Sequence, residues 1–331
     1  MQPMTTSDPR LPQAPRPPEA ARPSKSPGAQ RAGKAGQPRQ LQPGRASSHG
    51  VAASQGLQPV AGLELHPGQS VELLKELHIL TREGKLNQDS RRKLKQVNHL
   101  LQFIEPLLQQ VLDERGDVTL ADHGAGKSYL GFMLYDRFFS QRSVGQVFGI
   151  ETRTELVAKS QQLAQRLGFG RMHFLPLSVQ ASMTSAALPA HIDVVTALHA
   201  CDTATDDAIA FGLAKQARHL VLVPCCQAEV AGVLRKHKAL NLAKNPLSEI
   251  WRHPLHTREF GSQITNVLRC LQLEAHGYSV TVTELVGWEH SMKNELILAS
   301  KVGSGKRSAQ ERLAQVLQEL GLEELTRRFG I

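Results

Sequence analysis

The first part of the chain with regular patterning carries apolar residues at helical spacing. One apolar face comprises Val71, Leu74, Leu77 and His78, and a longer one comprises Leu94, Val97, Leu101, Ile104, Leu108 and Leu112. Apolar residues that recur every three or four positions predict amphipathic helices. Asn87 or Asp89 is the expected start of the longer helix, because short polar side chains cap helix N-termini, and Pro106 is expected to kink it. The pattern predicts a helical addition ahead of the main fold.

Beyond Gly116 short apolar runs alternate with amphipathic helical stretches. The runs expected to form strands are residues 118–121, 146–150, 172–177, 192–198 and 219–223. Strands that alternate with helices in this way are typical of a parallel sheet with helices on both faces. The alternation excludes an all-α and an all-β fold.

In the last part of the chain two expected strands follow each other without a helix between them. A helix is expected over residues 264–275, strands over 278–286 and 295–301, and an amphipathic helix over 309–329. The eight residues between the two strands leave no room for a crossover helix, so these strands must form an antiparallel hairpin. The predicted fold class is α/β: a seven-stranded, doubly wound, mostly parallel Rossmann-like sheet with an antiparallel final hairpin and an N-terminal helical addition.

Composition separates a tail from this patterned region. Residues 1–60 contain 11 of the 18 prolines, eight Lys or Arg against two acidic residues, and no aromatic residue. Such a segment cannot bury enough apolar surface to offset its ordering entropy, so disorder is expected. The tail carries +6 of the formal net charge of +9, which leaves the remainder only mildly basic. Its dispersed charges suit weak binding to RNA or an acidic surface, or a solvated extension without a dedicated partner.

Localisation follows from what the pattern lacks. No run of 18 apolar residues occurs and the start has no apolar segment of the secretory kind, so we expect a cytoplasmic protein with no membrane partner. The four cysteines are too few and too irregularly spaced for a disulfide framework, and reduced thiols are expected.

A glycine-containing turn follows the first expected strand and reads Asp122-His123-Gly124-Ala125-Gly126-Lys127-Ser128. In doubly wound sheets ligands bind beyond the carboxyl ends of the strands. A phosphate-binding loop matches this turn only with alanine as its leading residue, and a dinucleotide fingerprint lacks its third glycine, where Tyr129 stands. S-adenosylmethionine uses both the Asp122 carboxylate and the glycines, so it is favoured among the three ligands.

Two further strand ends fit the same ligand. Glu151 ends the second strand, 25 residues beyond Gly126, where a carboxylate can accept from both hydroxyls of a ribose. The alternative is an acid that favours the start of a helix. Ser178 follows the third strand and can hydrogen-bond to adenine, but it is the less diagnostic residue of the two.

The fourth and fifth strands run into Leu198-His199-Ala200-Cys201-Asp202-Thr203-Ala204-Thr205-Asp206 and Pro224-Cys225-Cys226. With the first turn, these motifs resemble the methyltransferase domain family that contains the methyltransferase-like protein 25 group. More distantly they resemble eukaryotic tRNA ribose 2′-O-methyltransferases. The resemblance covers residues 87–300 and includes Glu289-His290-Ser291-Met292-Lys293-Asn294. Ser128 and Asp202 both replace a glycine of the family pattern.

This resemblance implies a class I S-adenosyl-L-methionine-dependent methyltransferase. The cofactor-binding residues it implies are Asp122, Gly124, Ala125, Gly126, Glu151, Ser178 and His199, and the substrate-side residues are Thr205, Asp206, Cys225, Cys226, Arg258 and Asn294. His199 and Asp202 are the candidate catalytic bases, if the acceptor must lose a proton at all. His199 is equally compatible with a structural role.

No metal is expected at this edge. Cys201, Cys225 and Cys226 with His199 form an alternative zinc cluster. It is disfavoured because adjacent cysteines rarely reach one metal without strain, and small buried thiols lining a pocket are the simpler interpretation.

The expected regions are a disordered tail (1–62), the helical addition (63–115), the methyltransferase domain (116–303) and the C-terminal helix (304–331). RNA, such as tRNA or rRNA, is the expected acceptor, because a long basic connection follows the fifth strand on the ligand side. That connection is equally compatible with a simple helical cover. A protein or small-molecule acceptor, or a noncatalytic binding module that keeps the fold, are the alternatives.

Overall fold

Seven strands form one sheet in the order β3-β2-β1-β4-β5-β7-β6. The strands are β1 (Thr119–His123), β2 (Gln146–Ile150), β3 (Met172–Leu175), β4 (Val194–Leu198), β5 (His219–Val223), β6 (Tyr278–Glu284) and β7 (Glu295–Lys301). β1 to β5 are parallel to their neighbours, and β7 is antiparallel to both β5 and β6. The predicted fold class, with its mostly parallel sheet and antiparallel final hairpin, is confirmed.

The computed structural model describes residues 69–198, 200–225, 227–238, 249–250, 252–285 and 295–330. All of these belong to one packed unit. Within these ranges no helix is both long and apolar enough to cross a membrane.

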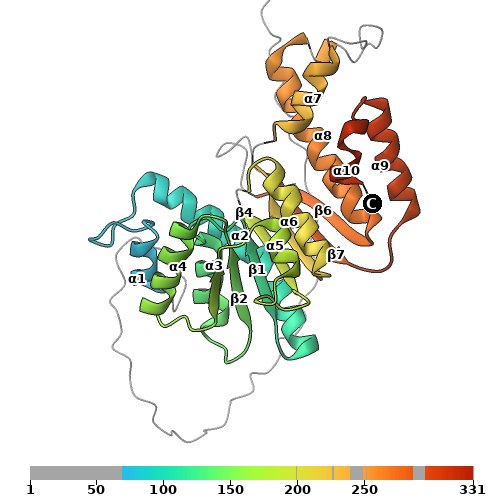
Figure 1. The fold of residues 1–331 in the computed structure, drawn as a ribbon. Helices are drawn as coiled ribbons and strands as arrows, with labels where there is room; N and C mark the ends of the chain where they lie inside the picture. Colours follow the sequence, from blue (N-terminus) through green and yellow to red (C-terminus); the bar gives the residue numbers. More distant parts are fainter. Residues whose placement is uncertain are drawn as a thin grey trace, which may run out of the picture. The chain divides into compact units, whose positions relative to one another are not determined.

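Helices cover both faces of the sheet (Figure 1). One face packs against α1 (Val71–Glu76), α2 (Gln88–Arg115), α3 (Tyr129–Leu134) and α4 (Thr154–Arg166), and α3 continues into a π-helical turn, Tyr135–Phe139. The other face packs against α5 (Val179–Thr184), α6 (Thr203–Ala214) and α8 (Pro254–Ala275). A third apolar cluster joins α8 to α7 (Glu229–Lys238), α9 (Arg307–Glu319) and α10 (Thr326–Phe329). The sheet therefore lies between two helical layers, and the carboxyl ends of its parallel strands form one edge.

The N-terminal helices follow their sequence signals. The Asn87 side chain accepts a hydrogen bond from the Ser90 amide at 2.7 Å and caps α2. Gly116 ends α2 in the left-handed conformation, at φ 72°. α2 runs as one element through Pro106, and its predicted stripe from Leu94 to Leu108 is buried. His78 departs from the prediction, because α1 ends at Glu76 and leaves the His78 side chain exposed.

Two helices differ from the sequence pattern. α8 begins at Pro254, ten residues before the expected start, because its early buried face consists of Thr257, Gly261 and Thr265 and carries no apolar signal. Gly261 lets α8 approach α7 closely, since a Cβ there would lie 2.7 Å from the Ala231 side chain. The expected single C-terminal helix breaks after α9, where Gly321 adopts φ 64°. A 3-10 turn and α10 follow the break.

Candidate functional site

The glycine turn after β1 is folded back onto the end of β2. Gly124 and Gly126 adopt φ 67° and 57°, a conformation that glycine takes without a steric penalty. The Ala125 amide donates to the Ile150 carbonyl at 3.0 Å, and the Ser128 amide donates to the Ala125 carbonyl at 2.6 Å. The turn therefore leaves a close backbone approach at the point where the strand order reverses, which is the ligand-binding position in sheets of this type.

Asp122 lies beneath this turn and is 2% exposed. Its carboxylate accepts from Thr196 Oγ1 at 2.9 Å and from Ser128 Oγ at 3.4 Å. Burial raises the pKa of the Asp122 carboxyl to about 6, against an ordinary value of 3.8. In this structure the carboxylate joins β1, β4 and the glycine turn, so its predicted contact with a cofactor stays a prediction. The buried Ser128 hydroxyl is committed to Asp122, which leaves the phosphate-loop alternative without its metal-holding hydroxyl.

Glu151 joins the end of β2 to the glycine turn. Its Oε2 accepts from the Gly126 amide at 2.9 Å, and its Oε1 accepts from Arg153 Nε at 3.0 Å. Hydrogen bonds from Arg153 are the main reason why the pKa of Glu151 falls to about 2. The Arg153 side chain is 59% exposed, so its guanidinium is the partner that an incoming pair of hydroxyls can displace. The structure thus brings Glu151 and the glycine turn together.

His123, which the sequence motif contains but to which no role was assigned, is 5% exposed at the end of β1. Neither ring nitrogen has a hydrogen-bond partner in the structure, and the ring centroid lies 5.2 Å from that of Phe211 on α6. Burial lowers the pKa of His123 to about 4, so the ring is neutral at pH 7. An unsatisfied buried polar group costs about 1–3 kcal/mol. Its position beside the glycine turn makes His123 a candidate ligand-binding group.

Asp202 follows β4 and caps a different helix from the one it precedes. Its Oδ1 accepts from the amides of Ala228 at 2.9 Å and Glu229 at 3.3 Å, at the start of α7. Its backbone adopts φ 51° and ψ −123°, a conformation that favours glycine. Glycine, the residue at this position in the family pattern that the sequence resembles, fits this backbone without strain. In Asp202 the capping bonds offset the strain, and its role as a base stays a prediction.

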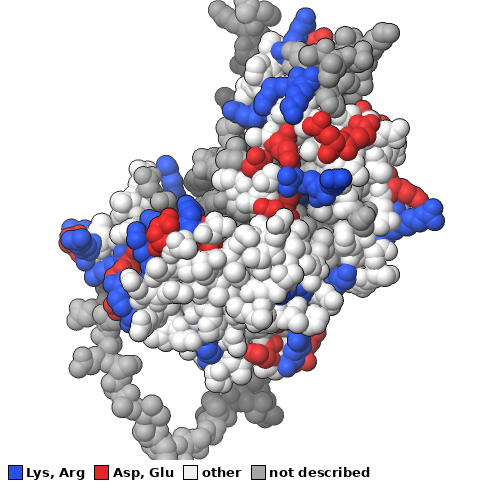
Figure 2. Space-filling model, in the orientation of Figure 1, with Lys and Arg blue, Asp and Glu red and all other residues white. Residues whose placement is uncertain are grey.

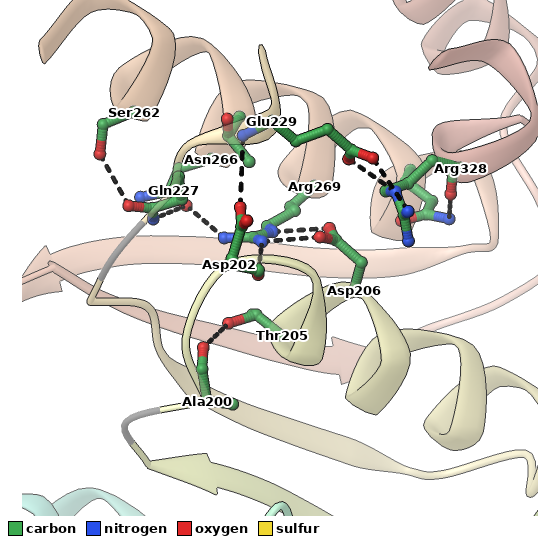
Figure 3. A network of polar contacts seen from close by, with 12 residues as sticks. Ala200, Asp202, Thr205, Asp206, Gln227, Glu229, Ser262, Asn266, Arg269 and Arg328 are labelled. Carbon is green, nitrogen blue, oxygen red and sulfur yellow. Dashed lines mark hydrogen bonds and ion pairs between the residues drawn. The ribbon is translucent and has the colours of Figure 1, made fainter. Parts of the chain in front are cut away.

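Thr205 and Asp206 lie in the first turn of α6 and are buried (Figure 3). Thr205 Oγ1 donates to the Ala200 carbonyl at 2.6 Å. Arg269 of α8 donates to both carboxylate oxygens of Asp206, at 2.7 and 2.8 Å, and to the Asp202 carbonyl at 2.8 Å. Both side chains are turned into the protein rather than towards an open substrate side. Contact with a substrate stays a prediction for them and requires that these bonds break.

The remaining predicted residues are spread around the same edge. Cys225 follows β5, and its sulfur lies 3.0 Å from that of Cys201, which follows β4. Arg258 is exposed on α8 and pairs with Glu259 at 2.8 Å, and exposed Ser178 caps α5. His199, Cys226 and Asn294 lie outside the described residues. Among the described residues no group of three His, Cys, Asp or Glu side chains lies close enough to hold a metal ion.

A cavity of about 410 Å³ lies beside Cys225, between α8 and the ends of β6 and β7. Its charged lining residues are Glu259, Glu284 and Glu295. A chain of amides forms one wall. Asn266 donates to Glu295 at 2.6 Å. Gln227 donates to Asn266 at 2.9 Å (Figure 3). Carboxylate and amide oxygens accept hydrogen bonds, so the cavity suits a group that carries N–H or O–H donors.

Residues 92–233 match a family model described as a methyltransferase domain. This match supports methyl transfer as the activity and S-adenosyl-L-methionine as the cofactor. The matched region includes the glycine turn, Glu151 and the start of α7, and it contains the ends of β1 to β5. No curated protein sequence matches the chain.

Solved structures with a remote likeness to the chain include several methyltransferases. An rRNA methylase from Streptococcus thermophilus is 12% identical, with a TM-score of 0.37 over 61% of this chain and 95% of that one. Magnesium protoporphyrin IX methyltransferase from Synechocystis PCC 6803 is 15% identical, with a TM-score of 0.39 over 70% and 93%. A putative caffeoyl-CoA O-methyltransferase from Staphylococcus aureus is 11% identical, with a TM-score of 0.39 over 71% and 93%. The acceptors named for these three proteins differ.

The residues at the ends of β1 and β2 fit the cofactor. Gly124 has open space, since a Cβ there would meet nothing closer than Ala200 at 3.9 Å. Glu151 supplies the carboxylate that two hydroxyls require, and His123 supplies buried ring nitrogens without partners. S-adenosyl-L-methionine, when bound, supplies a methyl group already activated on a sulfonium. The chain's own task is to bind and align the reactants.

Asp202 caps α7 with its side chain and has a strained backbone, and these two features give a prediction about stability. Asp202→Asn keeps an acceptor oxygen for the cap, so its unfolding temperature is expected to equal that of the wild-type protein. Asp202→Ala loses the cap and keeps the strained backbone, so we expect a loss of about 1–2 kcal/mol. Asp202→Gly also loses the cap but relieves the strain, and it should lie between the two. Thermal unfolding of the three variants tests this order, and equal stability of the Ala and Gly variants would contradict it.

Proposed function

We propose that this chain is an S-adenosyl-L-methionine-dependent methyltransferase that acts on RNA. The observation that carries the first part is the junction of the glycine turn with Glu151 through the Gly126 amide, at the reversal of strand order. The neighbouring His123 adds a buried polar group without a hydrogen-bond partner at the same strand end. The family match over residues 92–233 supports the same conclusion.

In this proposal Glu151 binds the ribose hydroxyls, while the glycine turn lets the backbone approach the cofactor. The neutral His123 ring offers one hydrogen-bond donor and one acceptor. The acceptor group enters from the β5 side, where the cavity beside Cys225 opens. Transfer of an activated methyl group demands little covalent chemistry from the protein, so alignment supplies most of the acceleration. A base is required only where the acceptor must lose a proton, and His199 and Asp202 remain the candidates.

Cofactor binding is tested by calorimetry with S-adenosylhomocysteine. Glu151→Ala removes charge-assisted hydrogen bonds worth about 1.5–3 kcal/mol, so affinity is expected to fall by about ten-fold or more. Glu155→Ala is the matched control, because Glu155 is an exposed acid four residues away on α4. Equal affinities of the two variants would exclude Glu151 from the site. Failure of the wild-type protein to bind at millimolar ligand would favour the noncatalytic binding module.

RNA as the acceptor is supported by the long basic connection after the fifth strand and by the distant resemblance to tRNA ribose methyltransferases. A cationic acceptor, such as a basic protein, is the second candidate, because three glutamates line the cavity beside Cys225. Incubation with tritiated cofactor and fractionated cell extract separates the two. RNA methylation predicts label that ribonuclease releases, and protein methylation predicts label that a protease releases.

A further inference from the structure

A second cavity, of about 310 Å³, lies on the other side of the glycine turn, against the N-terminal helices. The end of α1, the residues around Lys127 and the outer surface of α4 form its walls. Its volume is at the lower end of the range for small-molecule sites, about 300–1,000 Å³. None of the cofactor-binding residues of the proposed function lines it.

The charge of this cavity is positive. Lys127 and Lys159 line it and form no ion pair with any described residue. Arg166, the third cation, pairs with Glu76 at 3.0 Å, so these two charges cancel. Figure 2 shows Lys and Arg side chains together with acidic ones over the part of the molecule where α1 and α4 lie. The two lysines leave a net charge suited to an anion.

The rest of the lining is mixed, with aliphatic and aromatic surface beside the polar residues His78, Ser160 and Gln162. Leu156 and Leu163 of α4 contribute aliphatic surface, and Tyr129 contributes a ring at the start of α3. Burial raises the pKa of Tyr129 above its ordinary value of 10.0, so its hydroxyl stays neutral. Aromatic side chains stack with nucleobases, and lysines bind the phosphates of the same strand. Cations beside a ring and an apolar wall match the chemistry of a nucleoside phosphate better than that of a free inorganic anion.

We propose that this cavity binds one nucleoside phosphate of an RNA strand, with Lys127 and Lys159 on the phosphate and the base against Tyr129. The inference rests on the proposed function, because it names how the RNA acceptor is held. Lys127 follows directly after Gly126, so a nucleotide bound here lies against the turn that approaches the cofactor.

The test uses the full chain and a fluorescent 12-residue oligouridylate, with binding followed by anisotropy at several salt concentrations. The double variant Lys127→Gln, Lys159→Gln is expected to bind at least about ten-fold more weakly. Its slope of log affinity against log salt should be shallower by about 0.7, since both lysines bind the same phosphate and each single-strand phosphate contact contributes about 0.7. Tyr129→Leu removes the ring while keeping both charges, and it should weaken binding at all salt concentrations without changing the slope.

Lys236→Gln with Lys306→Gln is the matched control, because it removes two exposed lysines away from the cavity. The basic tail is the same in all variants. Equal losses in the two double variants, or no loss in either, would overturn the proposal. Adenosine monophosphate and inorganic phosphate serve as competitors: displacement by the nucleotide supports a nucleoside site, and equal displacement by phosphate overturns it.

The cofactor function is measured separately in the same preparations. Binding of S-adenosylhomocysteine by the wild-type protein tests the methyltransferase, whatever the oligouridylate does. Loss of oligouridylate binding in the lysine variant supports the cavity, whatever the cofactor does. A failure of one proposal is therefore distinguishable from a failure of the other.

Discussion

Arg269→Met is expected to destabilise the fold by about 3–5 kcal/mol, because it leaves the Asp206 carboxylate buried without its partner. The two side chains are 1% and 5% exposed, and Arg269 also donates to the Asp202 carbonyl and to Asn266 Oδ1. The guanidinium thus connects the loop after β4, the first turn of α6 and the body of α8. Urea unfolding followed by circular dichroism measures the loss.

The control is the double variant Asp206→Leu, Arg269→Met, which removes both charges and keeps most of the side-chain volume. A buried ion pair replaced by apolar residues is often neutral for stability, so the double variant should recover most of the loss. A double variant as unstable as Arg269→Met would show that the bonds to Asp202 and Asn266, rather than the ion pair, dominate.

Asp122→Asn is expected to raise the stability of the protein at pH 7 while weakening its binding of S-adenosylhomocysteine. The native carboxyl has a pKa of about 6, against 3.8 in the unfolded chain, so the native state holds its proton more tightly. Wild-type stability relative to the variant therefore falls as the pH rises from 3.8 to about 6 and is constant above. The full difference is up to about 3 kcal/mol. Part of this gain is lost, because the Asp122 carboxylate also accepts a hydrogen bond from the Gly131 backbone amide and the NH2 of the new side chain cannot.

Thermal unfolding between pH 4 and pH 8 checks the sign of this effect. Asp113→Asn, which removes an exposed carboxylate on α2, is the control and should leave the pH dependence unchanged. A wild-type protein that gains stability relative to Asp122→Asn as the pH rises would contradict the assignment. A gain in stability with a loss of binding is the pattern of a residue kept for function.

Most of the fold was predictable because alternation and helical periodicity record burial directly. The 146–150 and 219–223 strands were predicted to the residue, and the hairpin followed from the short connection between its strands. The first half of α8 was missed because its buried positions are Thr257, Gly261 and Thr265. Small and polar residues pack there against α7, and no hydrophobic pattern reports that contact.

The candidate site was predictable at its backbone and less so at its side chains. The motif located the glycine turn and Glu151, which the structure joins through one hydrogen bond. Residue type alone could not distinguish a carboxylate that faces a ligand from one that holds a helix, as with Asp206. His123 had a usable signal, because it follows Asp122 at the buried carboxyl end of β1, where ligands bind in sheets of this type. The pairing of Arg269 with Asp206 required the fold, since 63 residues separate them.

The capping of α7 by Asp202 has a mechanical consequence. Two amides at the start of α7 take their acceptor from the loop after β4. Sliding one of these segments past the other would break both hydrogen bonds, so the exits of β4 and β5 are expected to move together. Widening of the entrance beside Cys225 is then expected at its other side, where β6 ends and β7 begins.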